Sequence, residues 1–522
     1  MTVDATAGAE RSAKDAWSVP LWLVLTTGGL VLAGGYVVDD AFVVFRVAER
    51  LARGEGWSFQ GSASADGVTA PLWGALLALL VPGGSTPLVA RLLGSLFTLA
   101  GGTLTLAALR GQPRTLAALF LGAQLPVVVW AGAGLETGFV LLVVALCTRG
   151  LLVRRSGEAA RPAPDAAVES HGGPWESLCR ALTLGAFASV PWLRPELVPL
   201  AAMAGWELMR MERRERGARL APLLVLGVGT LLVIVWRVVA FGHPAPLAAL
   251  AKPSDPLNGL LYVGQGLLAA GALTALAIAA IARLRARVQR TDQPLEAAPL
   301  TDDDHPHDPQ QERGGRAPIR VLGVGLLSIA LAGGDWMPAS RLLVPLLPLL
   351  AGCVGLGLAE LPRFRWAAVL AVLLLPLATG AAALPELLRQ PAARERGAAQ
   401  VLAALHGAER VALVDIGYLA YAGDLQVVDL GGITDLEIAR LPGGHLSKRI
   451  PESLLRGRGV DAIVLHSTTP PRVEAGRLMG ISAYPVELHV ARMPFVRDEF
   501  RVTASVTYAP DYHYVVLRRS PP

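Results

Sequence analysis

The sequence predicts an α-helical polytopic membrane protein with a C-terminal α/β domain. Hydrophobic residues make up 53% of the 522-residue chain and charged residues only 17%, whereas about a quarter of the residues in a soluble protein are charged. The hydrophobic residues form blocks of about 15–25 residues, which is the length of a helix that crosses a bilayer. After residue 385 these blocks stop, and shorter apolar runs between polar segments indicate strands and helices.

The net charge of +5 and the pI of about 9.3 do not indicate nucleic-acid binding. The arginine-rich segments RMERRERGAR (210–219) and RLRARVQR (283–290) lie between apolar blocks. Positively charged loops of this kind mark the cytoplasmic side of a membrane protein. The charge therefore predicts topology, and nucleic acid is not an expected partner.

Charge and block length together predict about eleven spans. Arg11 and Lys14 precede the first apolar block and place the N-terminus inside. The block at 70–82 is short for a crossing, so we expect it to lie in the interface or to re-enter. A composition rich in Ala, Gly, Leu and Arg is typical of a GC-rich bacterial genome, but composition does not fix the organism. The predicted parts are an inside tail (1–17), a transmembrane domain (18–385) with a first external loop (39–87) and a disordered cytoplasmic loop (283–317), and an external α/β domain (386–522).

Polar residues at the ends of the expected spans fall on one face of the membrane. Ionisable residues at membrane depth are costly and therefore usually functional. Gathered on the outer face, they predict a polar cavity that opens outward. Its expected members are Asp39, Asp40, Glu136, Arg194, Glu196, Lys252, Asp335 and Arg341.

The pair Asp39 and Asp40 begins an amphipathic helical pattern. A carboxylate in low-dielectric surroundings has a raised pKa and can accept a proton from a hydroxyl group. We therefore expect a catalytic base with a second carboxylate beside it, the alternative being two solvated residues that cap the helix. Glu49, Arg50 and Arg53 on the same helix are expected to lie on lipid headgroups.

Four cations are candidates for binding a lipid-linked phosphate, namely Lys252, Arg194, Arg341 and Arg46. The alternative is that their side chains extend to the membrane interface without binding a ligand. Glu136 and Glu196 are expected either to orient sugar hydroxyls or to have local roles. The local roles are a favourable position at a helix N-terminus for Glu136 and an ion pair with Arg194 for Glu196.

Two further stretches have simpler interpretations. His305 and His307 lie in an acidic tract of low apolar content, which indicates disorder rather than a metal site. In the C-terminal region, apolar runs and period-two alternation predict buried strands followed by later, half-buried ones. The predicted strand segments are 410–422, 425–432, 461–467, 500–509 and 512–519.

Several segments, in the same order, resemble one family. The sequence DDAFVVFRVAERLARGEGWSF (39–59) followed by GVTAPLW (67–73) resembles the opening of the GT-C membrane glycosyltransferases. The resemblance is to the actinobacterial terminal arabinofuranosyltransferase group and related bacterial proteins. The segments that continue it are GLET (134–137), LRPEL (193–197), FGHPAPLAALAK (241–252), GGDWMPASRLLVPLLPLL (333–350) and VDLGGITDLEIAR (428–440). The chain departs from the family pattern at Ala70 and at residues 247–250.

The resemblance implies a GT-C fold and transfer of a sugar, with inversion, from a polyprenyl-phosphate donor. The acceptor would be an envelope glycan, lipid or protein at the outer face of the bacterial cytoplasmic membrane. Asp39 would be the base and Asp40 its helper, and Asp335, Trp336 and His243 would join the sugar or acceptor site. No fixed cofactor is implied, although a divalent cation, Mg²⁺ or Mn²⁺, bound by Asp40 is left open. The alternatives are a transporter or lipid-linked sugar flippase, and an inactive envelope scaffold.

Overall fold

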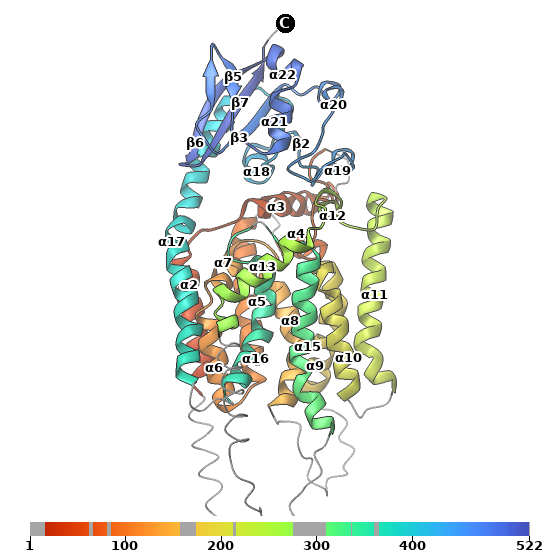
Figure 1. Cartoon of the computed structure of the whole chain (residues 1–522). Helices are drawn as coiled ribbons and strands as arrows, with labels where there is room; N and C mark the ends of the chain where they lie inside the picture. Colours follow the sequence, from red (N-terminus) through yellow and green to blue (C-terminus); the bar gives the residue numbers. More distant parts are fainter. Residues whose placement is uncertain are drawn as a thin grey trace, which may run out of the picture.

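The structure is a computed structural model that describes residues 16–61, 66–80, 85–156, 174–211, 216–274, 309–335, 337–359 and 365–520. A bundle of helices forms one end, and a mixed sheet with short helices forms the other (Figure 1). The described helices of the bundle are α2 (Ser18–Leu32), α3 (Asp39–Ala52), α4 (Pro71–Leu80), α5 (Thr86–Ala107), α6 (Gly111–Gly122), α7 (Leu125–Gly132), α8 (Thr137–Arg155), α9 (Pro174–Leu193), η1 (Pro195–Leu197), α10 (Val198–Met211), α11 (Arg216–Phe241), α12 (Leu247–Ala251), α13 (Pro256–Ala269), α15 (Pro309–Leu331), η2 (Arg341–Leu346), α16 (Leu347–Ala359) and α17 (Arg365–Ala404).

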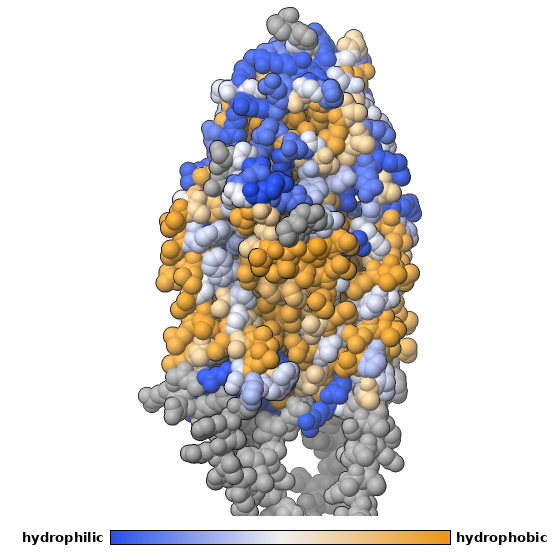
Figure 2. Space-filling view, turned by 180° about the vertical axis from the view of Figure 1, so that it is seen from behind, coloured by the Kyte–Doolittle hydropathy of each residue, from blue (hydrophilic) through white to orange (hydrophobic). Residues whose placement is uncertain are grey.

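The bundle has the composition of a membrane domain. Within the described ranges, five helical segments are long and apolar enough to cross a membrane, and the bent pair α6–α7 makes a sixth if it is counted as one span. Figure 2 shows hydrophobic residues around the helical part and hydrophilic residues over the α/β end on the face in view. The chain is therefore a helical membrane protein with several spans, while the figure of about eleven stays a prediction.

Close helix packing in the bundle depends on small residues. A Cβ atom on Gly229 of α11 would lie 2.3 Å from the carbonyl oxygen of Ala188 in α9, and one on Gly138 of α8 would lie 2.1 Å from that of Gly94 in α5. Helices in a membrane associate through such close backbone contacts, because lipid tails are as apolar as the side chains. These glycines therefore set how closely the helices approach.

Two expected segments differ in detail from the structure. The span expected at 114–131 is broken into α6 and α7, which meet at 61°, because Pro126 lacks an N–H donor and fits only at a helix start. At the break, Gln124 Nε2 donates to the carbonyl oxygen of Phe120 at 3.1 Å. Of the expected disordered loop 283–317, residues 309–317 are helical in α15, and the rest, with His305 and His307, lies outside the described residues.

The C-terminal part is an α/β domain, as the sequence predicts. Strands β1, β2 and β3 are parallel, and β7 and β6 continue the sheet antiparallel in the order β2-β1-β3-β7-β6. Every residue of β1, β2 and β3 is buried, which explains why their sequences are apolar apart from the last residues of β2 and β3. The elements are β1 (Val411–Leu413), α18 (Tyr418–Gly423), β2 (Val427–Asp429), α19 (Leu436–Ala439), α20 (Glu452–Gly457), β3 (Ala462–Ser467), β4 (Arg472–Glu474), β5 (Arg477–Gly480), α21 (Pro485–Ala491), α22 (Pro494–Glu499), β6 (Phe500–Ala509) and β7 (Tyr512–Arg519).

The α/β domain shares a hydrophobic core with the bundle. Alternate strand residues point to opposite faces, so Val411 and Val464 join the cluster that contains α3 and α17, while Ala412 and Ile463 pack in a separate cluster with α21 and α22. In addition, α17 runs unbroken from the bundle to the sheet (Figure 1). The boundary expected at residue 386 therefore lies inside a helix, because the linking segment keeps helical periodicity instead of forming a loop.

Gly229→Ala should destabilise the bundle by about 1–3 kcal/mol, because the new methyl group meets backbone that cannot move aside. The matched control is Gly227→Ala in the same helix, whose added Cβ meets no atom within 4 Å. The control should leave stability unchanged or raise it by up to about 1 kcal/mol through helix propensity. Thermal unfolding in detergent measures both, and equal effects of the two substitutions would contradict this packing.

Candidate functional site

Helix α3 lies across the end of the bundle, directly beneath the α/β domain (Figure 1). Asp39 and Asp40 form its first turn, where negative charge is favoured by the helix dipole. Residues 41–48 are all buried, since bundle helices cover one side and α18 the other. The residues expected on lipid headgroups, Glu49, Arg50 and Arg53, follow this buried stretch.

The polar residues at the end of α3 show the same arrangement. Glu49 accepts a hydrogen bond from the hydroxyl of Tyr421 in α18 at 2.7 Å, and another from Thr86 in α5. Arg50 Nε donates to Ser58 Oγ at 3.0 Å, and Arg53 pairs with Glu55. Glu49 and Arg50 thus bind protein partners, which corrects their expected position, whereas Arg53 is exposed and its position on headgroups stays a prediction.

Asp39 joins α3 to the α/β domain. Its two carboxylate oxygens accept hydrogen bonds from the backbone N–H groups of Gly417 at 3.1 Å and Tyr418 at 2.9 Å. A Cβ on Gly417 would lie 2.1 Å from Asp39 Oδ2, so only glycine permits this approach. Burial and the charge of nearby Asp415 together raise the pKa of Asp39 to about 7, although the hydrogen bond from Tyr418 lowers it. A carboxylate with such a pKa is suited to general-base chemistry.

Asp40 has a different environment from its neighbour. Burial raises its pKa, while Lys252 and Arg341 oppose this effect and Asp335 adds to it. Among the described residues, neither Asp40 nor Lys252 makes a side-chain hydrogen bond or a salt bridge. The carboxylate of Asp40 and the ammonium group of Lys252 thus interact electrostatically without direct contact. Both groups are therefore available to bind a ligand.

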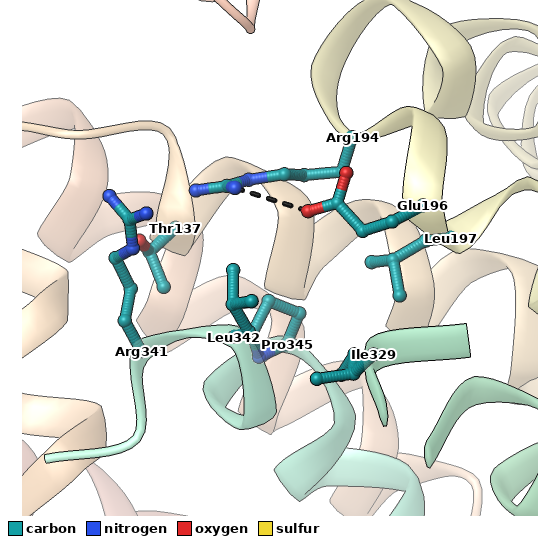
Figure 3. Close-up of a pocket in the computed structure, with 8 residues that line it drawn as sticks. All are labelled: Thr137, Arg194, Glu196, Leu197, Ile329, Arg341, Leu342 and Pro345. Carbon is teal, nitrogen blue, oxygen red and sulfur yellow. Dashed lines mark hydrogen bonds and ion pairs between the residues drawn. The ribbon is translucent and has the colours of Figure 1, made fainter. Parts of the chain in front are cut away.

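A small pocket of about 10 Å³ is lined in part by Arg341, whose charge acts on Asp40. In Figure 3, Arg194 and Glu196 point toward its centre from one side and Arg341 stands on the other. Arg194 pairs with Glu136 and with Glu196, whose Oε1 lies 3.1 Å from Arg194 Nη1. The other residues that line the pocket are Thr137, Leu197, Ile329, Leu342 and Pro345.

Arg341 connects the pocket to Asp40. Its Nε lies 2.7 Å from Asp335 Oδ2, and its guanidinium lies 5.7 Å from the centre of the Trp130 ring. The two residues before it, Ala339 (φ 55°) and Ser340 (φ 47°), both adopt left-handed backbone conformations. Such strain is kept where the surroundings fix a functional geometry. Arg194 and Arg341 thus each form an ion pair with a carboxylate, whereas Lys252 forms no direct ion pair in the described part of the chain.

Arg46 was expected to bind phosphate, and the structure corrects this expectation. Its guanidinium donates to the carbonyl oxygens of Ala420 and Leu425 and pairs with Asp424 at 3.1 Å. The physical reason is helical geometry, because Arg46 follows Asp39 by two turns and shares its face. That face meets the α/β domain, so Arg46 anchors the domain.

His243 was expected in the sugar or acceptor site, but its side chain is engaged elsewhere. Its ring is buried and stacks on Phe241, and Nδ1 lies 2.6 Å from the carbonyl oxygen of Ala245. Asp66, which accepts a hydrogen bond from Arg237 at 3.0 Å, lies 4.0 Å from the same ring nitrogen. We therefore assign His243 to holding the loop after α11. Trp336 lies outside the described residues.

Two residues of the site were missed by sequence reasoning. Asp415 follows β1 and acts electrostatically on both Asp39 and Asp40. Arg394 of α17 donates to the carbonyl of Val37 and lies 4.7 Å from the centre of the Tyr418 ring. Only Asp415 carried a signal, since carboxylates at the carboxyl ends of parallel strands commonly face ligands. The described residues contain no cluster of three or more metal-binding side chains, so a divalent cation at Asp40 stays a prediction.

Comparison with protein families adds one finding. A family model described as a domain of unknown function (DUF8728) matches residues 388–517. The matched region comprises the last part of α17 and nearly all of the α/β domain. No curated protein and no solved structure matches this chain.

Gly417→Ala should loosen the α/β domain from α3, because the new methyl group overlaps Asp39. Hydrogen exchange of the backbone amides of residues 36–48, followed by mass spectrometry, should become at least about tenfold faster, equivalent to about 1.4 kcal/mol. Gly457→Ala in α20, where a Cβ meets nothing within 4 Å, should leave this exchange unchanged. Unchanged exchange in Gly417→Ala would count against the Asp39 contact.

Proposed function

We propose that the protein is a GT-C-type membrane glycosyltransferase that moves a sugar from a polyprenyl-phosphate donor to an envelope glycan, lipid or protein. The observation that carries this proposal is that a carboxylate base and phosphate-binding cations lie at the same end of the helical bundle. Asp39 has a pKa near 7 and can act as a base, and Asp40 and Lys252 have no direct partner in the described residues. Arg341 and Arg194, each held in an ion pair with a carboxylate, lie nearby.

The arrangement supplies the two parts that transfer from a lipid phosphate requires. The acceptor oxygen attacks the anomeric carbon while Asp39 takes the hydroxyl proton. The bond between the anomeric carbon and the phosphate oxygen breaks, and the polyprenyl phosphate leaves with the electron pair. Lys252 and Arg341 stabilise the negative charge that develops on this phosphate. Attack from the side opposite the phosphate inverts the anomeric carbon.

The orientation of α8 supports an outward-facing site. The helix begins at Thr137 in the pocket and ends with Arg154 and Arg155 at its other end. Arginines at the ends of spans favour the cytoplasmic side. The pocket, α3 and the α/β domain are thus proposed to face outward, at the bacterial cytoplasmic membrane.

The first test is sugar transfer by the purified full chain in nanodiscs, with a panel of polyprenyl-phosphate sugars and an envelope fraction as acceptor. Release of polyprenyl phosphate should fall at least about 100-fold in Asp39→Asn, which keeps an oxygen for one backbone N–H but is not basic. Lys252→Gln should also lower turnover, and Lys252→Arg should restore part of it. The control is Asp461→Asn. Asp461 lies before β3, and its carboxylate accepts hydrogen bonds from the backbone N–H groups of Glu409 and Arg410 at 2.9 Å.

Turnover that is unchanged in Asp39→Asn would remove the base assignment and keep the enzyme class. Binding of a lipid-linked sugar without turnover would favour the transporter interpretation. Neither binding nor turnover with any donor would leave the scaffold interpretation.

The transfer rate should depend on pH through Asp39. The base acts when deprotonated, and its pKa is near 7. The rate should therefore rise about tenfold per pH unit below pH 7 and level off above it. A rate that is flat from about pH 5.5 to 8.5 under conditions limited by chemistry would contradict this role.

A further inference from the structure

The carboxyl edge of the parallel strands in the α/β domain is a place where ligands commonly bind. Strand β1 lies between β2 and β3, so the chain leaves β1 toward one side and later returns on the other. At such a reversal the connecting loops separate, and ligands bind outside the carboxyl ends of the strands. In this domain the edge is formed by the residues after β1 and the end of β3.

Asp415 lies at this edge, two residues after β1. The hydroxyl groups of Tyr512 and Tyr514, both from β7, donate hydrogen bonds to the same oxygen, Oδ2, with Tyr514 at 3.1 Å. Burial and the charge of Asp415 raise the pKa of Tyr512, which keeps its hydroxyl protonated as a donor. Among the described residues, Oδ1 of Asp415 accepts no hydrogen bond. One oxygen of a fixed carboxylate is thus available.

Aromatic rings flank this carboxylate. The His466 ring lies 4.6 Å from the Tyr512 ring and 4.8 Å from the Tyr484 ring, measured between centres. Glu487 fixes His466 by accepting a hydrogen bond from its backbone N–H at 2.7 Å and by contacting Nδ1 at 3.3 Å. His466 is buried, whereas Tyr484, Tyr512 and Asp415 are partly exposed. The two tyrosines therefore present ring surface beside a hydroxyl-accepting oxygen.

This edge faces the Asp pair of the bundle. The loop that holds Asp415 continues into Gly417 and Tyr418, whose N–H groups bind Asp39. Asp415 is also the charged group with the largest effect on Asp39. A ligand bound at Asp415 would therefore lie next to the proposed base.

We propose that Asp415, Tyr512 and Tyr484 form a glycan-binding subsite that positions the acceptor sugar beside Asp39. A sugar offers hydroxyl groups that bind a carboxylate oxygen through charge-assisted hydrogen bonds, and apolar C–H faces that pack on aromatic rings. The binding of a glycan rests on these residues alone. Its role as the acceptor site rests on the function proposed above.

The direct test is glycan binding by the full chain in nanodiscs, measured by saturation-transfer NMR and calorimetry. The probes are arabinan, glucan, mannan and galactan hexasaccharides without lipid. At least one should bind, and Asp415→Asn and Tyr484→Ala should each weaken its affinity at least about tenfold. Asp461→Asn, at the opposite edge of the same sheet, should bind within about twofold of the native chain. Absence of binding by the native chain, or equal binding by all four proteins, would overturn the subsite.

Kinetics separate this inference from the proposed function. If transfer occurs, Asp415→Asn should raise the acceptor KM at least about tenfold, with the donor KM unchanged. If the native chain shows no turnover but binds a glycan, and the variants lose this binding, the subsite is supported and the transferase proposal is rejected. Turnover whose acceptor KM is the same in Asp415→Asn supports the transferase and removes the subsite.

Discussion

The contact between α3 and the α/β domain is the interaction on which the site depends. A desolvated carboxylate is costly unless hydrogen bonds compensate it, and Asp39 obtains two from Gly417 and Tyr418. Arg46, two turns later, makes three more to the same domain. These bonds hold an amphipathic helix between two protein layers, so that one of its aspartates meets the domain and the other faces the cations of the bundle.

The distribution of partners divides the charged residues into two groups. Arg194 and Arg341 are each paired with carboxylates, which holds their guanidinium groups in place before any ligand arrives. Asp40 and Lys252 have no direct partner in the described part of the chain. Charged groups that are held by a partner provide an electrostatic field of fixed direction. Groups without a direct partner can form new ion pairs or hydrogen bonds with a ligand. A site for an anionic, hydroxyl-bearing substrate needs both.

The α/β domain is part of the same structural unit as the bundle. One face of its sheet shares a core with α3 and α17, and α17 enters it without a break. Since ordinary domain linkers are exposed and make few contacts, a domain joined in this way keeps a fixed position. Asp415 is therefore held beside Asp39, and its charge acts on that carboxylate.

The sequence by itself determined the features that depend on local composition and period. These are the apolar helices, the amphipathic helix after Asp39, and the strands at 500–509 and 512–519. Tertiary structure decided which groups these residues bind. Asp39 binds a residue 378 positions away, and Arg46 binds the α/β domain. His243 binds within its own loop, and Asp415 lies beside Asp39. Hydrophobic period is set by neighbouring residues and is visible in the chain, whereas a hydrogen bond needs two distant segments to meet, and only folding brings them together.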